Sequence, residues 1–422
     1  MLLTYLGSIF SMAHFTLLTF IIIGIIILNY VVERVLARLN ARAAGDKIPD
    51  ELSGIFDAAE YAKQQAYFRT NQHFESVTST ISTAAILLMF LFGGFAIVNG
   101  WAEYLASQTI IVSLIFFGIL FVASTILGLP ADYYRQFVIE EKFGFNKSTR
   151  SLFFSDQVKS LLLSMILGGA LVGLIEWIYL AVPDFFWILA FLIIAAFSIF
   201  LNMFYTSLIV PLFNKQTPLE EGDLRTAIEQ FAHSVGFQLN NIYVMNASKR
   251  STKANAYFSG LGPKKRVVLF DTLINDLTNE EIVAVLAHEI GHYKHRHTLQ
   301  MLLISLLNTF IMTALLGVFL SSDTLALAFG VTKANFHINL LAFGLLYTPV
   351  SVLIGWGVNA FSRHNEYQAD AFAASHGQGE ALIAALRKLS AKSLSNLTPH
   401  PAFVSFYYSH PTLLQRIRAI RK

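Results

Sequence analysis

The sequence contains no cysteine and little charge. Charged residues make up only 14% of the 422 residues, whereas hydrophobic residues make up 55%; a typical soluble domain carries about 25% charged residues. Without cysteine, disulfides and cysteine-ligated metal sites are excluded, so histidine, aspartate or glutamate must hold any metal. The formal net charge of +3 gives no reason to expect a nucleic-acid partner. The mean hydropathy of +0.56 is typical of a polytopic membrane protein.

Long apolar segments predict the fold class. A helix needs about 20 apolar residues to cross a bilayer, and seven segments meet that requirement, which predicts an all-α polytopic membrane protein. The fifth and seventh exceed one crossing, so their ends are expected to continue into water. The predicted spans are 15–35, 79–98, 109–129, 161–182, 185–210, 299–320 and 338–361.

The basic residues predict the topology. Of the 30 Lys and Arg residues, 6 lie in 33–75, 5 in 130–160, 10 in 213–298 and 8 after residue 361. The remaining one is Lys333, so the even-numbered loops are nearly free of basic residues. Because basic residues favour the cytoplasmic side, we predict an outside N-terminus and a cytoplasmic C-terminus.

Two regions are large enough to fold outside the membrane. We predict a membrane domain at 1–213, with spans one to five and a polar loop at 36–78. A cytoplasmic fifth loop at 214–298 should form a small α+β portion, with an amphipathic helix at 217–237 and strands at 241–246 and 266–270. Spans six and seven follow at 299–361. A cytoplasmic tail at 362–422 should pack on the fifth loop.

The fifth loop ends in a motif that predicts a metal site. Thr278 and Glu281 have the spacing of a capping box, which starts a helix, and His288-Glu289-Ile290-Gly291-His292 lies within its apolar helical pattern. Histidines four residues apart share a helix face and can bind one zinc ion. Glu289 lies beside them, and Gly291 is expected to leave the side between them open. This is the HExxH pattern of zinc proteases; the alternative is a solvated, histidine-rich helix end.

A catalytic zinc normally has three protein ligands and one open position. After the seventh span, the helical stretch FSRHNEYQADAFAASHG places Glu366 and Asp370 four residues apart. The predicted topology brings this stretch to the same side as His288 and His292. We therefore predict Glu366 as the third ligand and Asp370 as the hydrogen-bond partner of a ligating imidazole. The alternative is a solvated helix face.

The predicted chemistry is hydrolysis of a peptide bond by zinc-activated water, with Glu289 as general base. The oxyanion that develops needs a further donor, for which His410 and Arg363 are candidates; His410 could equally be a surface residue. Asn255 could hold substrate backbone at a sheet edge, or could be an ordinary turn residue. Glu176, next to Trp177 in the fourth span, is expected at the membrane interface.

Motifs outside the HExxH run resemble one family throughout the chain. The chain is similar to the type I CAAX prenyl endopeptidases, integral membrane zinc proteases that trim prenylated C-terminal CAAX motifs. The matching blocks are LPADYYRQFVIEEKFGFNKST at 129–149, PLFNK at 211–215, NASKRSTKANAYFSGL at 246–261, VVLFDTL at 267–273, NEYQADAFA at 365–373 and YYSHPTLLQRI at 407–417.

This resemblance implies roles for individual residues. It implies zinc ligands at His288, His292 and Glu366, and a general base at Glu289. It also implies an acid behind the ligands at Asp370, a backbone-gripping asparagine at Asn255 and transition-state support from His410. It further implies that the seven helices enclose a water-filled chamber.

The function predicted from the sequence is a zinc endopeptidase, with one Zn²⁺ per chain, that cuts CAAX-type or related membrane-associated peptides. Its partners would be a peptide or protein substrate, prenylated or not, and the lipid bilayer, with no nucleic acid. Alternatives are a quality-control protease for misfolded membrane proteins and, from another class, a metal transporter. Short loops and the lack of a KDEL-type signal favour a bacterial inner membrane, or the endoplasmic reticulum if the source is eukaryotic.

Overall fold

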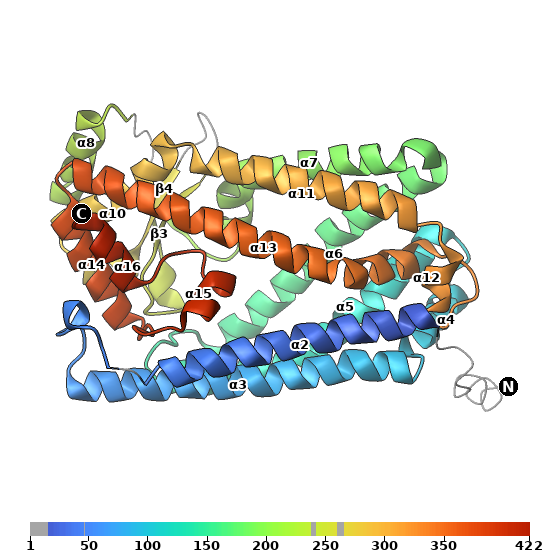
Figure 1. Cartoon of the computed structure of the whole chain (residues 1–422). Helices are drawn as coiled ribbons and strands as arrows, with labels where there is room; N and C mark the ends of the chain where they lie inside the picture. The colour runs from blue at the N-terminus through green and yellow to red at the C-terminus, as the bar shows by residue number, and fades with distance from the viewer. Residues whose placement is uncertain (1–15, 46, 238–241, 260–265) are drawn as a thin grey trace.

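The computed structural model describes residues 16–45, 47–237, 242–259 and 266–422. Long helices run along most of the molecule, and four short strands lie at one end with the C-terminus (Figure 1). Seven helices in this part of the chain are long and apolar enough to cross a membrane, which confirms the predicted fold class. They span Leu17–Ala43, Ala58–Leu91, Thr109–Glu140, Arg150–Ala181, Pro183–Leu212, His297–Phe319 and Phe336–Ser375.

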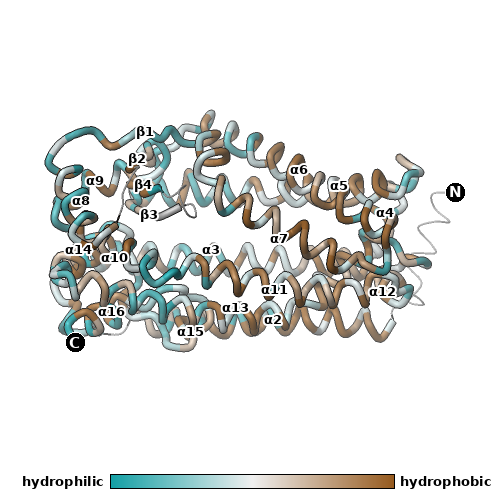
Figure 2. The backbone as a smooth tube through the Cα atoms, turned by 90° about the horizontal axis from the view of Figure 1, so that it is seen from above, coloured by the Kyte–Doolittle hydropathy of each residue, from teal (hydrophilic) through white to brown (hydrophobic). Residues whose placement is uncertain are grey.

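The seven spans are built on helices α2 (Leu17–Ala43), α3 (Ala58–Leu91), α5 (Thr109–Tyr134), α6 (Arg150–Ala181), α7 (Phe186–Phe204), α11 (His297–Phe319) and α13 (Phe336–Ser375). Helix α13 has 40 residues, which corresponds to about 60 Å at 1.5 Å per residue. A bilayer core is only about 30 Å thick, so α13 continues well beyond one crossing, as predicted. Figure 2 shows hydrophobic residues along the helical bundle and hydrophilic residues gathered at the end that carries the strands.

The small sheet has the strand order β1-β2-β4-β3. Strands β2 (Ile242–Met245) and β4 (Arg266–Phe270) pair in parallel, which confirms both predicted strands within the described residues; residue 241 lies outside them. Strand β1 (Gln216–Pro218) pairs antiparallel with β2. Strand β3 (Ala256–Ser259), which was not predicted, pairs antiparallel with β4 and forms one edge.

The predicted helix at 217–237 is shorter than expected. It begins only at Asp223, as α8 (Asp223–Ser234), because Gln216–Pro218 instead forms hydrogen bonds with β2. The apolar face of α8 packs on α10 (Asn279–Lys294) through buried residues such as Ile228 and Ile282. The remaining helices are α4 (Gly94–Leu105), α9 (Asp271–Asp276), α12 (Asp323–Leu327), α14 (Gly379–Lys392), α15 (Pro401–Tyr407) and α16 (Leu413–Ile420).

The helix that carries the HExxH run starts where its capping box predicts. Thr278 accepts a hydrogen bond from the Glu281 amide, and the Glu281 carboxylate accepts one from the Thr278 amide, at 3.3 and 2.8 Å. Such a cap typically stabilises a helix by about 1 kcal/mol. Glu281 also pairs with Lys388 of α14 at 2.7 Å. The N-terminus of α10 is thereby fixed both within the helix and against its neighbour.

Glu176, which was predicted at the membrane interface, lies inside the helical bundle near the C-terminal end of α6. Its side chain is fully buried, and it accepts a hydrogen bond from Ser113 of α5 at 2.9 Å. Ser113 also contacts His337 Nδ1 at 2.9 Å, and His337 Nε2 lies 2.6 Å from Asn99 Oδ1. A buried chain of polar groups thus joins α4, α5, α6 and α13 at the end of the bundle away from the sheet. Tertiary packing supplies the partners that a lone glutamate in a span lacks.

Candidate metal centre

Helix α10 presents two imidazoles to the same point. His288 and His292 lie one turn apart, and their Nε2 atoms are 3.1 Å from each other. His288 is 6% exposed, because the surrounding face of α10 forms part of the core between the sheet, α8 and α14. At this separation, both nitrogen atoms could bind the same ion. The helix therefore supplies two donors from a buried, preorganised surface.

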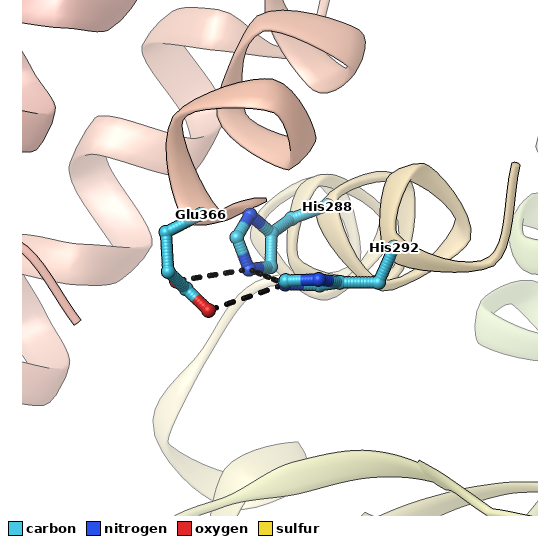
Figure 3. A group of neighbouring side chains, drawn as sticks. All are labelled: His288, His292 and Glu366. Atoms are coloured by element: carbon cyan, nitrogen blue, oxygen red, sulfur yellow. Dashed lines mark hydrogen bonds and ion pairs between the residues drawn. The ribbon is translucent and has the colours of Figure 1, made fainter. Parts of the chain in front are cut away.

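Helix α13 brings the third donor from far along the chain. Glu366 Oε1 lies 3.3 Å from His292 Nε2, and Glu366 Oε2 lies 3.5 Å from His288 Nε2. Figure 3 shows the three side chains converging from the two helices. Among the described residues, they form the only group of three His, Asp or Glu side chains that could hold a metal ion.

Gly291 explains how the two helices come so close. A Cβ atom at this position would lie 2.9 Å from the Cα atom and 3.1 Å from the carbonyl oxygen of Ala369. Contacts below about 3 Å are not tolerated without movement, so only glycine permits this packing of α13 on α10. The expectation that Gly291 keeps the side between the ligands open is therefore wrong: that face is filled by the backbone of α13.

The donor geometry fits a tetrahedral ion. Bonds of about 2.0–2.1 Å to nitrogen and oxygen, directed to the corners of a tetrahedron, place ligand atoms about 3.3–3.4 Å apart. The three separations of 3.1, 3.3 and 3.5 Å bracket this value. Two imidazoles and one carboxylate leave the fourth corner for a substrate or water, which is the composition of an open catalytic site.

Asp370 lies behind the first histidine. Its Oδ1 atom is 2.8 Å from His288 Nδ1, and its carboxylate is 1% exposed. Arg416 of α16 donates to both Asp370 oxygens, at 2.9 Å from Nε and 2.6 Å from Nη2. A bidentate pair of this kind fixes both planes, so the orientation of the His288 ring is determined by α13 and α16 together.

The charges at the site call for a divalent cation. Glu289, Glu366 and Asp370 are carboxylates, and Arg416, whose Nη1 lies 3.7 Å from Glu366 Oε2, is the cation among them. Together these four groups carry a formal charge of −2, which a divalent ion neutralises. Burial alone would lower the pKa of Arg416, but the hydrogen bonds to Asp370 and the nearby carboxylates raise it, so the guanidinium stays charged.

The pKa of His292 is also raised. Burial opposes its positive charge, but the hydrogen bond to Glu366 and the charge of Glu289 outweigh that effect. Glu289 is half-buried on the same helix and close enough to act on both His292 and Arg416. In the metal-free protein, the neighbouring carboxylates therefore favour the protonated form of His292.

The structure separates the two candidates for the additional donor. His410 Nδ1 lies 2.9 Å from Glu366 Oε2, and the His410 side chain is 63% exposed, so it borders the donor group and is accessible. Arg363 instead donates from Nη1 to the carbonyls of Val404, Ser405 and Tyr408, at 3.2, 3.2 and 2.6 Å. Those bonds fasten Arg363 to the end of α15, so His410 is the candidate that contacts the donor group directly.

Asn255 lies at the start of the edge strand that the sequence did not predict. Its side chain is exposed, its carbonyl accepts from the Phe270 amide at 3.0 Å, and its Oδ1 accepts from the Ala256 amide at 2.9 Å. Strand β3 is one of the two edge strands of the sheet, and β1 is the other, whereas β4 is central.

A cavity of about 820 Å³ opens next to the second histidine. Its walls include His292, the sheet residues Met245, Tyr257 and Phe270, and Asn202 near the end of α7. The lining is mostly apolar, with a few polar groups. Binding pockets for small ligands and side chains have this character, so the cavity provides space for an apolar group beside the donor atoms.

Two residues of the site were missed by sequence reasoning. Arg416 lies in the YYSHPTLLQRI block, near His410, and its position on a short amphipathic helix was the available signal. His297, five residues beyond His292, contacts His292 Nδ1 at 2.9 Å. It was read only as part of a histidine-rich helix end. Neither residue shows its role by spacing alone, because each acts through a partner that folding brings close.

Comparison with known families gives two matches that together cover most of the chain. Residues 38–215 match the family described as "CAAX prenyl protease N-terminal, five membrane helices". Residues 218–422 match peptidase family M48.

Individual relatives agree with these matches. "CAAX prenyl protease 1" of Saccharomyces cerevisiae is 37% identical over 402 residues, covering 89% of this chain and 88% of the yeast protein. The human "CAAX prenyl protease 1 homolog" is 32% identical over 420 residues, covering 89% and 88% of the two chains. The crystal structure of S. mikatae Ste24p matches with a TM-score of 0.90 and 35% identity, covering 96% of this chain and 99% of that one.

Proposed function

The chain belongs to peptidase family M48 and is a membrane metalloendopeptidase of the CAAX prenyl protease type, and from this premise we propose how it acts. It cleaves peptide bonds of CAAX-type substrates at the group formed by His288, His292 and Glu366. The observation that carries this proposal is the convergence of these three donors from α10 and α13, with separations that suit one tetrahedral ion.

Zinc is the metal that this donor set favours. Two neutral imidazole nitrogens and one carboxylate are a recurrent catalytic zinc set, and the absence of cysteine excludes thiolate sites. When bound, zinc would lower the pKa of a water molecule and polarise the scissile carbonyl. One ion per chain is expected, because the described residues contain one such group.

The surrounding residues hold and move protons. Glu289, half-buried and beside the ligands on α10, accepts a proton from the attacking water and passes it to the leaving amine. Asp370, held by Arg416, accepts the Nδ1–H of His288 and so keeps the Nε2 lone pair directed at the metal position. His410 is accessible at the edge of the group and donates to the oxygen on which negative charge develops.

Substrate backbone would pair with the free edge of β3. An extended peptide added there gains main-chain hydrogen bonds, and Asn255 lies exposed at the start of that edge. The cavity beside His292 would take an apolar side chain next to the scissile bond. This assigns backbone recognition to β3 and side-chain selection to the neighbouring cavity.

The membrane arrangement follows the charge distribution. Seven spans and basic odd-numbered loops support an outside N-terminus, with the sheet, α10 and the tail in the cytoplasm. The proposed division remains a membrane domain at 1–213, the loop at 214–298, two spans at 299–361 and the tail at 362–422. In the 18-residue apolar stretch that defines each span, only 6–28% is buried inside the protein. This low burial suits helices that form the wall of a chamber. Residence in a bacterial inner membrane, or in the endoplasmic reticulum of a eukaryote, remains a prediction.

The decisive experiment compares one peptide with and without a farnesyl group, with purified protein in detergent or liposomes. We expect the wild-type protein to cut the farnesylated peptide within three residues of the modified cysteine, and only when zinc is present. The Glu289→Gln variant should still bind zinc but should not cut the peptide. Equal cleavage of both peptides would favour the quality-control alternative. Full activity of Glu289→Gln would refute the mechanism. The transporter hypothesis has lost its support, because the donors lie on α10 and the far end of α13 and the chain belongs to a peptidase family.

A further inference from the structure

The second histidine of the HExxH run has its own hydrogen-bonded support. His292 Nδ1 lies 2.9 Å from His297 Nδ1, and His297 Nε2 lies 2.8 Å from Gln368 Oε1. Gln368 Nε2 lies 3.2 Å from His364 Nε2. His297, the first residue of α11, is 3% exposed. Gln368 lies on α13 between Glu366 and Asp370.

Only one arrangement of protons satisfies this chain of contacts with a metal at the donor group. His292 Nε2 faces the other donors, so it must offer its lone pair and its hydrogen must lie on Nδ1. That hydrogen is donated to His297 Nδ1, which leaves the hydrogen of His297 on Nε2. His297 then donates to Gln368 Oε1, and the Gln368 amide group donates to His364.

We propose that His297 and Gln368 are positioning residues that fix the tautomer and ring orientation of His292 for metal binding. The inference rests on the proposed metal site. The two histidines are then held in different ways. His288 is held by the charged Asp370–Arg416 pair, and His292 is held by an uncharged hydrogen-bonded chain of His297 and Gln368, which we call the relay. The relay also joins the metal donors to the first turn of α11 and to α13, the two helices that continue into the membrane.

The neighbouring His295 provides a matched control. Its ring stacks on that of His297 at 5.5 Å between centroids and 13° between planes, but its side chain is exposed. Its ring does not touch the donor group in the part of the chain that the structure describes. Replacing His295 therefore changes the histidine-rich helix end without breaking the relay.

The test measures zinc affinity by competition with a chromophoric chelator, using the full-length protein in detergent. Loss of a hydrogen-bond partner behind a metal ligand typically lowers affinity about 10–100-fold, and we expect this for His297→Phe and for Gln368→Met. Gln368→Glu keeps an acceptor, now charged, and should bind zinc at least as tightly as the wild type. His295→Phe should leave the affinity unchanged.

Two further measurements separate positioning from general stability. The double variant His297→Phe/Gln368→Met should lose no more affinity than His297→Phe alone, since the two residues act in series. In cobalt-substituted protein, the visible absorption bands should shift in His297→Phe and Gln368→Met but not in His295→Phe.

The outcomes refute different claims. Wild-type affinity in Gln368→Met, or equal affinities of Gln368→Met and Gln368→Glu, would overturn the relay while leaving the metal site intact. Failure of the wild-type protein to bind zinc at all would overturn the proposed function and, with it, the relay.

Discussion

Replacing Arg416 with alanine should destabilise the metal-free protein strongly. Its side chain is 11% exposed and bonds both oxygens of Asp370, which is 1% exposed, while its Nη1 lies 3.7 Å from Glu366. The variant would leave two buried carboxylates without their cation. Removing one partner of a buried ion pair typically costs about 3–5 kcal/mol, which is a large part of the 5–15 kcal/mol stability of an ordinary domain.

Zinc should reduce this loss. The carboxylates and Arg416 carry −2 together in the wild type, and the variant carries −3, so a divalent ion interacts with a more negative site. We therefore expect zinc to raise the stability of Arg416→Ala by more than it raises that of the wild type. Catalysis should fall nonetheless, because Asp370 loses the bond that orients it toward His288.

The assay is denaturant unfolding in detergent micelles, with EDTA and with excess zinc. Arg418→Ala is the matched control on the same helix, since Arg418 pairs with Glu51 at 2.6 Å but both side chains are well exposed, at 57% and 39%. Solvent screening makes exposed pairs weak, so this variant should unfold almost like the wild type. If Arg416→Ala in EDTA is no less stable than Arg418→Ala, the assignment of Arg416 as a buried structural cation is refuted.

Other perturbations test the helix contact and the protonation of the ligands. Gly291→Ala places a Cβ atom 2.9 Å from the Ala369 Cα atom. We expect this variant to be destabilised by about 1–3 kcal/mol and to bind zinc more weakly in the chelator assay. The control is Gly344→Ala, where a Cβ atom has no neighbour within 4 Å, and it should be neutral or slightly stabilising. Because the pKa of His292 is raised above 6.5, its proton should compete with zinc, so that the apparent zinc affinity falls as the pH drops through the raised pKa. In the metal-free protein, the raised pKa of His292 contributes stability that is fully present below pH 6.5 and is lost as the pH rises through the raised pKa. As the pH rises, this contribution to stability should therefore fall in EDTA, whereas the stabilisation by zinc should grow. Absence of that reversal would argue against His292 as a ligand.

Much of the architecture could be predicted because it depends on local pattern. Span positions depend on apolar length, which a bilayer demands of any crossing helix, and the seven predicted spans were found. The capping box at Thr278 and the four-residue spacing of His288 and His292 are helix properties that need no tertiary information. The short strand at Arg266–Phe270 was predicted from its local sequence pattern, and the structure confirms it.

The failures have a common physical origin. Strand β3 has four residues, as many as the predicted strand β2, but its place at the sheet edge arises only from its pairing with β4. The buried hydrogen bond between Glu176 and Ser113 was not predicted, because it forms only when α5 and α6 pack together. The helix at 217–237 was predicted too long because the pairing of Gln216–Pro218 with β2 is a long-range contact.

The sequence by itself predicted seven helices long and apolar enough to cross a membrane, which the structure confirms, and a helix whose two histidines could hold a metal. Both follow from interactions between residues close in sequence, or from the bilayer as solvent. The sequence also predicted Glu366 and Asp370 for the candidate site, but only the tertiary structure shows that α13 reaches α10 at Gly291, that Arg416 bonds Asp370 and that His297 contacts His292. These contacts depend on the packing of helices that lie far apart in the sequence, and no local pattern encodes such packing.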